Sequence, residues 1–477
     1  MNDGSLDPDW ESFRRTLHDA ADGVVDFLAA SRERPAWQPV PGAVKDALRT
    51  PLPQDGEPLD DTHAAFRELI LPYATGNLHP RFFGWVHGAG TPAGVLAELL
   101  AAAMNANVGG REHAAVYVER AVVAWFTELF GFPPGSSGIV TTGTSMGNLL
   151  AIVAARDAAL GPSARDSGIA GAPLTAYTAV SAHDSVSKAL RIAGLGKHAL
   201  HTVPVDAAQR ADVAALRARI AADRAAGQRP FLLVATAGTV DTGAFDPLDA
   251  LADLCAQEGL WLHVDGAFGA LAIASPRHAH LVAGIGRADS LAFDAHKWLQ
   301  VPYAAGCVLF RDEAAHRAAF ASAPSYLARS RRGASAGEPW FADYGLELSR
   351  EFRALKIWFT LKHYGLRRLG ETIARTCDLA TALAARIAGA DDLELLAPVA
   401  LNVVCFRTRH AGVDAAAYHR ITDGIAVDVQ ESGDAVISTT RIGERLALRV
   451  CIVNHRTREE DLDRLLAAVR VAAARAA

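Results

Sequence analysis

Apolar residues recur at helical spacing near the N-terminus of the chain. Between residues 10 and 31, apolar side chains such as Phe13 and Leu17 fall on one face of a helix. Residues 34–61 are rich in proline and charge and contain only a short helical piece near Val44. An arm this thin cannot bury a core by itself, so we expect it to pack on the main body or on a second subunit.

The middle of the chain alternates between strand-like and helix-like stretches. Longer stretches with helical periodicity, such as 184–194 and 208–226, separate short apolar runs that are typical of buried strands. This alternation predicts a mostly parallel sheet with helices on both faces, in which ligands gather at the carboxyl ends of the strands. The strand-like runs are 138–142, 176–181, 231–236, 260–265, 290–293 and 306–310.

The pattern changes twice towards the C-terminus. Residues 311–345 break the alternation, and residues 322–337 within them are rich in Ser, Ala, Arg and Gly, which is typical of a long loop that covers an active site. A helix at 352–364, two strand-like runs and a final helix then predict a small α+β unit. We expect an N-terminal helical arm (1–78), a large domain (79–350) with a lid loop at about 322–345, and a small C-terminal domain (351–477).

The charge, the apolar runs and the cysteines of the chain disfavour several classes of protein. The 477 residues carry a formal net charge of −6, which disfavours nucleic acid and membrane surfaces as partners. The first residues lack the features of a secretory signal, and no apolar run approaches the length of a membrane span. The five cysteines are widely spaced and form no metal-binding pair, which predicts free thiols in the cytoplasm and no metal site.

Gly143, Thr144 and Ser145 lie between a predicted strand and a predicted helix. Backbone N–H groups at a helix N-terminus, together with two hydroxyl groups, can bind an anion such as a phosphate. Taken alone, the same residues also suit an ordinary helix cap after a glycine turn.

Three further polar residues follow predicted strands. His183 is an aromatic plate or a proton relay, although a lone histidine there is more often structural. Asp265 ends an apolar strand and needs a partner, which is an arginine, a group of backbone amides or a cationic ring nitrogen. Lys297 follows a strand-like run beside Trp298, where partial desolvation would make its amine nucleophilic. Together with the anion-binding turn, these groups match pyridoxal phosphate, which has a phosphate, a pyridinium and an aldehyde.

The sequence resembles the group II pyridoxal-phosphate decarboxylases, and most of all their aromatic-L-amino-acid decarboxylase branch. The resemblance implies a fold-type I enzyme with a mostly parallel seven-stranded sheet in its large domain. It also implies a homodimer with active sites at the subunit interface and an N-terminal arm that wraps the partner. The resemblance rests on His79-Pro80-Arg81-Phe82-Phe83, on residues 234–239, 262–267 and 288–290, on His296-Lys297-Trp298 and on residues 353–358.

The resemblance also implies a role for each residue of the site. Lys297 would bond covalently to the cofactor, Asp265 would pair with its pyridine nitrogen, and His183 would stack on its ring and relay a proton. Asp294 stands where the family usually has asparagine. The remaining cofactor contacts are expected from Gly143, Thr144, Ser145, Thr236, Ala267, Asp294 and His296.

The expected substrate pocket departs from the family's pattern. Gly88 stands where aromatic decarboxylases have a threonine near the substrate carboxylate, and Trp85 and Val86 replace aromatic residues of another shape. Asn105 and Asn107 stand where some relatives have apolar pocket residues. These departures concern the substrate more than the cofactor.

The lid departs as well. Counting back from residues 348–353 places the catalytic lid tyrosine of the decarboxylases on Phe341. In related plant enzymes a phenylalanine there resembles the aldehyde-synthase pattern, because slow protonation of the carbanion lets O₂ intercept it. Tyr344 or Tyr326 could supply the phenol instead, and Phe341 could simply pack.

We therefore expect a cytoplasmic homodimer that uses pyridoxal phosphate to convert an L-amino acid to an amine and CO₂. The substrate is expected to be aromatic, like Tyr, Dopa, Trp or Phe. The alternatives are an oxidative aromatic aldehyde synthase and a cofactor-binding scaffold without turnover. An aminotransferase is disfavoured because no arginine for a substrate carboxylate is evident, and glutamate-type substrates are disfavoured by Trp85.

Overall fold

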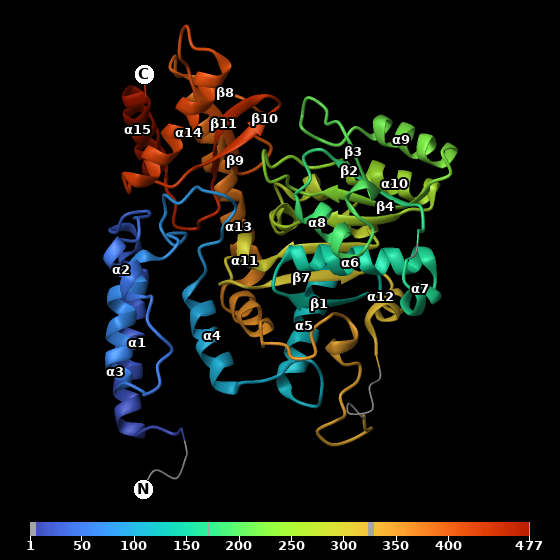
Figure 1. The fold of residues 1–477 in the computed structure, drawn as a ribbon, viewed down its shortest axis with the longest axis horizontal. Helices are drawn as coiled ribbons and strands as arrows, with labels where there is room; N and C mark the ends of the chain where they lie inside the picture. Colours follow the sequence, from blue (N-terminus) through green and yellow to red (C-terminus); the bar gives the residue numbers. More distant parts are fainter. Residues whose placement is uncertain (1–5, 170, 323–328, 477) are drawn as a thin grey trace.

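A seven-stranded sheet forms the centre of the chain in the computed structural model, which describes residues 6–169, 171–322 and 329–476 (Figure 1). Its strands are β1 (Ser137–Thr141), β2 (Leu174–Ala179), β3 (Leu200–Val203), β4 (Arg229–Thr236), β5 (Trp261–Asp265), β6 (Ser290–Asp294) and β7 (Gly306–Phe310). They lie in the order β1-β7-β6-β5-β4-β2-β3, and β7 is antiparallel to both of its neighbours while the other pairs are parallel. The predicted mostly parallel sheet is confirmed. The strand pattern missed only β3, which is short and half-buried.

Helices cover both faces of the sheet, as the strand–helix alternation predicted. They are α5 (Ala114–Leu129), α6 (Thr144–Leu160), α7 (Ser163–Ser167), α8 (Ser185–Ile192), α9 (Val213–Ala225), α10 (Leu248–Glu258), α11 (Ala295–Trp298) and α12 (Glu313–Phe320). Helices α6 and α8 pack on one face and α5, α9 and α10 on the other. Because each strand is then buried on both sides, its residues form continuous apolar runs rather than an alternating pattern.

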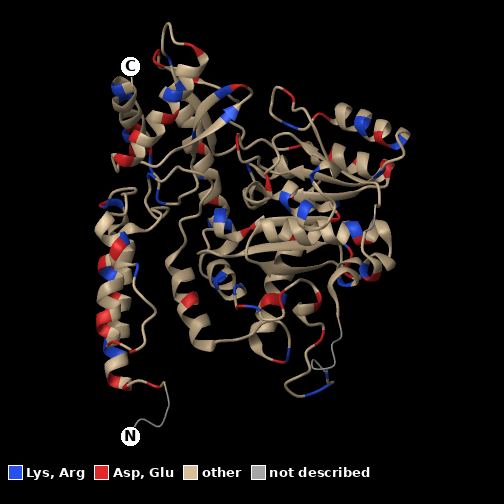
Figure 2. Cartoon of the chain, in the orientation of Figure 1, with Lys and Arg blue, Asp and Glu red and all other residues tan. Residues whose placement is uncertain are grey.

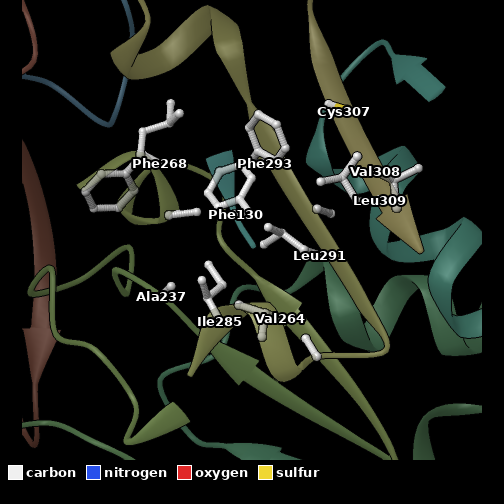
Figure 3. Close-up of a cluster of buried hydrophobic side chains, with 14 of the residues drawn as sticks. Phe130, Ala237, Val264, Phe268, Ile285, Leu291, Phe293, Cys307, Val308 and Leu309 are labelled. Carbon is white, nitrogen blue, oxygen red and sulfur yellow. The ribbon is translucent and has the colours of Figure 1, made fainter. Parts of the chain in front are cut away.

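The packing of β6 determines where the segment after it lies. Leu291 and Phe293 enter the core beside α5, and the ring of Phe293 lies 4.9 Å from that of Phe130 (Figure 3). On the opposite face, a Cβ on Gly147 of α6 would come within 2.7 Å of the Cβ of Ala292. The close approach of α6 to β6 therefore requires glycine, and it brings the N-terminus of α6 to the end of β6.

A smaller antiparallel sheet lies near the C-terminus and confirms the predicted α+β unit. Its order is β10-β11-β9-β8, with helices α14 and α15 packed beside it. Helix α13, kinked at Gly365, contacts α4 and α5 at its start and β8, β9 and α15 further on, so it links the two cores. The elements are α13 (Ala354–Ala388), β8 (Leu393–Leu395), β9 (Val403–Thr408), α14 (Ala415–Glu431), β10 (Ser438–Ile442), β11 (Arg445–Cys451) and α15 (Glu459–Ala476).

The N-terminal segment forms the helices α1 (Trp10–Ala29), α2 (Gly42–Ala47) and α3 (Leu59–Ala65), followed by α4 (Pro92–Met104). Helices α1 and α3 pack on each other along one side of the molecule (Figure 1). The predicted N-terminal helix is confirmed. Large apolar side chains nevertheless stay exposed on α1, on α4 and near α3, among them Trp10, Val25, Ile70, Leu96, Leu99 and Met104.

Residues 311–345, which interrupt the strand–helix alternation, contain more regular structure than their sequence pattern indicated. Residues 313–320 form α12, and Phe341–Asp343 form a turn of 3-10 helix whose three residues are buried. Tyr326 lies outside the described residues.

Charges of both signs are interspersed on the outer helices, as Figure 2 shows for α1 and α9. All five cysteines are buried and unpaired, as predicted. In the described ranges, no helix is both long enough and apolar enough to cross a bilayer.

Candidate active site

The carboxyl ends of β4, β5 and β6 meet the N-terminus of α6 around a cavity of about 510 Å³. The register of the sheet places Thr236 beside Asp265, and Asp265 beside Ala292. All ten residues predicted to contact the cofactor line this cavity, as do Trp85 and Val86 of the predicted substrate pocket. The ten are Gly143, Thr144, Ser145, His183, Thr236, Asp265, Ala267, Asp294, His296 and Lys297.

Asp265 is a buried carboxylate with no ion-pair partner among the described residues. Only 3% of its surface is exposed, and its oxygens accept hydrogen bonds from Asn148 Nδ2 at 2.8 Å and from the Ala267 N–H at 3.2 Å. Burial raises the pKa of Asp265, although Asn148 and the charge of Lys297 act in the opposite direction. Of the partners considered for this strand-end carboxylate, no arginine is present, so a cationic ring nitrogen in the cavity fits best.

A chain of buried hydrogen bonds orients the Asp265 carboxylate from behind. Trp261 Nε1 donates to Ser290 Oγ at 2.8 Å, and Ser290 Oγ lies 2.9 Å from His263 Nδ1. His263 Nε2 lies 2.9 Å from Asn148 Oδ1, and Asn148 donates to Asp265. Burial lowers the pKa of His263 to about 3, so its ring is neutral, with the proton on Nε2 directed to Asn148. Each bond in the chain therefore points towards Asp265.

The same asparagine also connects to His183. Asn148 Nδ2 donates to Ser185 Oγ at 3.0 Å, and Ser185 Oγ lies 2.8 Å from His183 Nδ1. The Ser185 N–H also donates to Nδ1, at 3.1 Å. Because Nδ1 accepts, the neutral ring of His183 carries its proton on Nε2.

Sequence reasoning missed this network, although one signal for it was present. His263 and Asp265 are two residues apart on β5, so they face the same side of the sheet. Asn148 and Ser185 belong to helices far apart in sequence, and their meeting depends on tertiary packing.

The turn before α6 has the groups that a phosphate needs. Thr144 Oγ1 is buried and has no hydrogen-bond partner in the described part of the chain. The Thr144 N–H donates to Asp294 Oδ1 at 2.7 Å, and Asp294 Oδ2 lies 3.1 Å from Lys297 Nζ. His296 Nε2 lies 3.7 Å from the same carboxylate, and burial lowers the pKa of His296. The orphaned hydroxyl and the helix N-terminus therefore fit a phosphate group at this end of the cavity.

The lining residues that sequence reasoning did not single out include His87 and Tyr303. Both come from loops, where the hydrophobic pattern carries no signal. Next to His87, a Cβ on Gly88 would lie 2.1 Å from the His296 carbonyl oxygen and 2.4 Å from that of Lys297. No side chain fits at position 88 unless α11 moves, which explains why threonine is absent there.

The structure does not bring Asn105, Asn107, Phe341 and Tyr344 to this cavity within one chain. Asn105 and Asn107 line another cavity, beside Arg353 and Lys356. Asn107 Oδ1 accepts hydrogen bonds from two backbone N–H groups, which gives it a local structural task.

Phe341 and Tyr344 line neither the Lys297 cavity nor the cavity beside Arg353. Phe341 is only 5% exposed, and the Arg350 guanidinium lies 5.1 Å from the centre of its ring. Tyr344 is also buried, and its hydroxyl donates to Glu313. Both are packed against their own chain because large aromatic side chains gain free energy by burial.

A lysine, a ring-facing carboxylate and a phosphate-binding turn on an α/β sheet define a pyridoxal-phosphate enzyme of fold type I. The model of the pyridoxal-dependent decarboxylase conserved domain matches residues 41–409, and the chain belongs to this family. The predicted family, fold and cofactor are therefore confirmed.

Curated relatives act on different amino acids. The chain is 32% identical to an aromatic-L-amino-acid decarboxylase of Bacillus atrophaeus, over 97% of this chain and 96% of that one. It is 32% identical to a phenylacetaldehyde synthase of Petunia hybrida, over 84% and 80%. It is 30% identical to an L-2,4-diaminobutyrate decarboxylase of Rhizobium meliloti, over 96% and 91%.

Solved structures share the whole fold. The Oryza sativa TDC with PLP and tryptamine superimposes with a TM-score of 0.90 at 27% identity, covering 99% of each chain. Mouse CSAD superimposes with a TM-score of 0.91 at 26% identity, covering 98% of this chain and 99% of that one. The reaction class is therefore amino-acid decarboxylation, while the relatives differ in substrate.

When bound, pyridoxal phosphate supplies an aldehyde that bonds to amines and a cationic ring that withdraws electrons from the reacting carbon. Lys297 is the amine that would hold it, and Asp265 would keep the ring nitrogen protonated. His183, with Nε2–H free to donate, lies on the same cavity wall as Asp265. The chain of donors behind Asp265 orients its carboxylate before any ligand arrives.

Asp265→Asn should stabilise the cofactor-free protein while weakening its affinity for pyridoxal phosphate. Burial raises the pKa of Asp265, so the ionised carboxylate opposes folding above the ordinary pKa of aspartate. The free energy of unfolding at pH 7 should therefore rise, on the order of 1 kcal/mol, and this gain should shrink as the pH falls towards 4. Cofactor affinity, measured by titration, should fall more than tenfold because the ring cation loses its partner.

Asp246→Asn is the matched control. Asp246 is equally buried, but its two oxygens accept the N–H groups of Thr236 and Ala211 at 2.7 Å each. Burial raises the pKa of Asp246 as well, so its replacement should shift the free energy of unfolding in the same direction, but cofactor affinity should change little because Asp246 does not line the cavity. A loss of cofactor affinity in Asp246→Asn as large as that in Asp265→Asn would contradict the role given to Asp265.

Proposed function

We propose that the protein decarboxylates an aromatic L-amino acid to the corresponding amine and CO₂. The observation that carries this proposal is the indole of Trp85. It lines the cavity with 46% of its surface exposed, on a backbone with a φ of 51°. A left-handed conformation is costly for a residue other than glycine, and such strain is typical of functional sites. An exposed indole at a cavity offers a flat apolar surface to an aromatic side chain.

The charges around the cavity also favour an uncharged substrate side chain. No arginine is among the described residues that line it, so an acidic side chain finds no cationic partner apart from Lys297. The lining carboxylates are Asp265 and Asp294, which face the expected ring and phosphate positions, so a basic side chain also finds no free partner. Similarity over nearly full length to the Bacillus aromatic-L-amino-acid decarboxylase supports the same choice.

The competing aldehyde-synthase reaction rested on Phe341 as the lid residue. In the structure Phe341 is buried beside Arg350 of its own chain and does not line the Lys297 cavity of that chain. The amine is therefore the preferred product. The similarity to the Petunia phenylacetaldehyde synthase keeps the aldehyde as the outcome against which the amine must be measured.

We also propose that the enzyme acts as a homodimer in the cytoplasm. Exposed apolar side chains on α1 and α4 support a dimer, because contiguous apolar surface of this kind is typical of subunit interfaces. Asn105 and Asn107 follow directly on α4, so a second subunit that covers α4 would also cover their cavity. Five unpaired thiols suit a reducing compartment. A single-chain mass in light scattering would contradict the dimer.

Product analysis across Tyr, Dopa, Trp, Phe, Glu and 2,4-diaminobutyrate tests the proposed reaction. With pyridoxal phosphate added, the aromatic amino acids should yield amine and CO₂ in equal amounts, with no uptake of O₂. Aldehyde, ammonia and peroxide together with O₂ uptake would select the oxidative reaction instead. Faster turnover of Glu or 2,4-diaminobutyrate than of every aromatic amino acid would overturn the substrate class.

A further inference from the structure

The imidazole of His87 is a polar group of the cavity to which the cofactor gives no task. His87 lines the cavity together with Trp85, Lys297 and Tyr303. Among the residues that the structure describes, none forms a hydrogen bond or an ion pair with its ring nitrogens. A half-buried imidazole without a protein partner is free to bond a ligand.

Aromatic packing fixes the orientation of this ring. The centre of the His87 ring lies 5.7 Å from that of Phe82 and 5.7 Å from that of Trp85, and both contacts are stacked. Tyr303 approaches edge-on at 5.8 Å. The backbone is held as well, because Asn77 Nδ2 donates to the Gly88 carbonyl at 2.7 Å. His87 therefore stands in a preorganised position.

The surroundings of His87 keep it neutral. Burial lowers its pKa, and the charges of Lys297 and His296 lower it further. Tyr303 also faces it, and burial raises the pKa of that phenol, which therefore stays protonated. A neutral imidazole has one N–H donor and one acceptor nitrogen.

Several other polar groups of the cavity have expected tasks of their own. Thr144 lies at the phosphate end, Asp265 and His183 share one donor network, and Asp294 pairs with Lys297. An amino-acid substrate brings one carboxylate that needs a hydrogen-bond donor, and the adjoining position 88 cannot carry a side chain.

We propose that His87 is a substrate-binding residue that donates a hydrogen bond to the α-carboxylate of the amino-acid substrate. This inference rests on the proposed function and adds to it the group that positions the bond to be broken. That bond joins the α-carbon to the carboxyl carbon. When it breaks, CO₂ leaves, the electron pair stays on the α-carbon until a proton arrives there, and His87 keeps its own proton throughout.

A neutral donor suits this reaction better than an arginine. The carboxylate loses its charge as CO₂ forms, so a fixed cation would stabilise the substrate more than the transition state. A hydrogen bond from a neutral imidazole also holds the carboxylate, but it stabilises the substrate over the transition state by a smaller amount. The contact should therefore act mainly on KM.

His87→Phe removes the donor and keeps an aromatic ring beside Phe82 and Trp85, so folding should be preserved. KM for the best aromatic substrate should rise about tenfold, while kcat changes less than threefold, as expected for the loss of one hydrogen bond to a charged group. His87→Asn retains a donor and should recover part of the loss. His363→Phe, the same substitution at an exposed position on α13, should leave both constants unchanged.

A binding measurement makes the test independent of turnover. 3-Phenylpropanoate carries the ring and the carboxylate of phenylalanine but has no amine to react with the cofactor, and 3-phenylpropanamide is its neutral counterpart. By calorimetry on the holoenzyme, His87→Phe should weaken binding of the carboxylate about tenfold and change that of the amide little.

Two results would overturn the role of His87. One is equal affinity of wild type and His87→Phe for 3-phenylpropanoate, and the other is a tenfold loss of kcat at unchanged KM. If the wild-type enzyme releases no CO₂ from any aromatic amino acid, the proposed function fails instead, and the binding measurement still decides whether His87 recognises a carboxylate.

Discussion

The Asp265 carboxylate, buried without a cation, is the constraint on which the site depends. Desolvation of an unpaired carboxylate opposes folding, and the structure offsets it only in part through Asn148 and one backbone amide. A ligand with a cationic ring removes this cost when it binds. The chain thus gives up some stability of its cofactor-free state in favour of a strong preference for one kind of ligand.

The pairing of the strands in the sheet fixes the relative positions of the residues around Asp265. Parallel pairing of β4, β5 and β6 sets Thr236, Asp265 and Ala292 in one row, and the apolar core beneath Phe293 holds the strand that leads to Lys297. Gly147 lets α6 approach this strand closely enough for Thr144 to reach Asp294. Small shifts in the core would therefore displace the lysine, the carboxylate and the phosphate-binding turn relative to one another.

Sequence reasoning found the residues expected around the cofactor, together with Trp85 and Val86, and missed other residues of the cavity for a physical reason. Lys297 and Asp265 follow buried strands, whose apolar runs are recognisable and whose ends share one edge of the sheet. His87 and Tyr303 lie in loops that meet only in the folded chain, so neither periodicity nor spacing indicates them. Phe341 was placed by counting along a loop, and counting gives no information on which side chains the fold buries.

The fold, like the site, was only partly predictable from the sequence. The doubly covered strands β4 and β5 were predictable, whereas the partly exposed strands β3, β8 and β10 and the helix α12 lack a strong hydrophobic pattern and depend on their neighbours. The linking helix α13 reads in sequence as an ordinary helix, and only its packing shows that its two ends belong to different cores.

We infer that this cavity holds pyridoxal phosphate through Lys297, one of only six lysines in the chain. Borohydride reduction of the cofactor-loaded protein, followed by digestion and mass spectrometry, tests it most directly. We expect one reduced pyridoxyl phosphate per chain, on the peptide that contains Lys297. A label on any other lysine, or no label on a protein that has bound the cofactor, would contradict it.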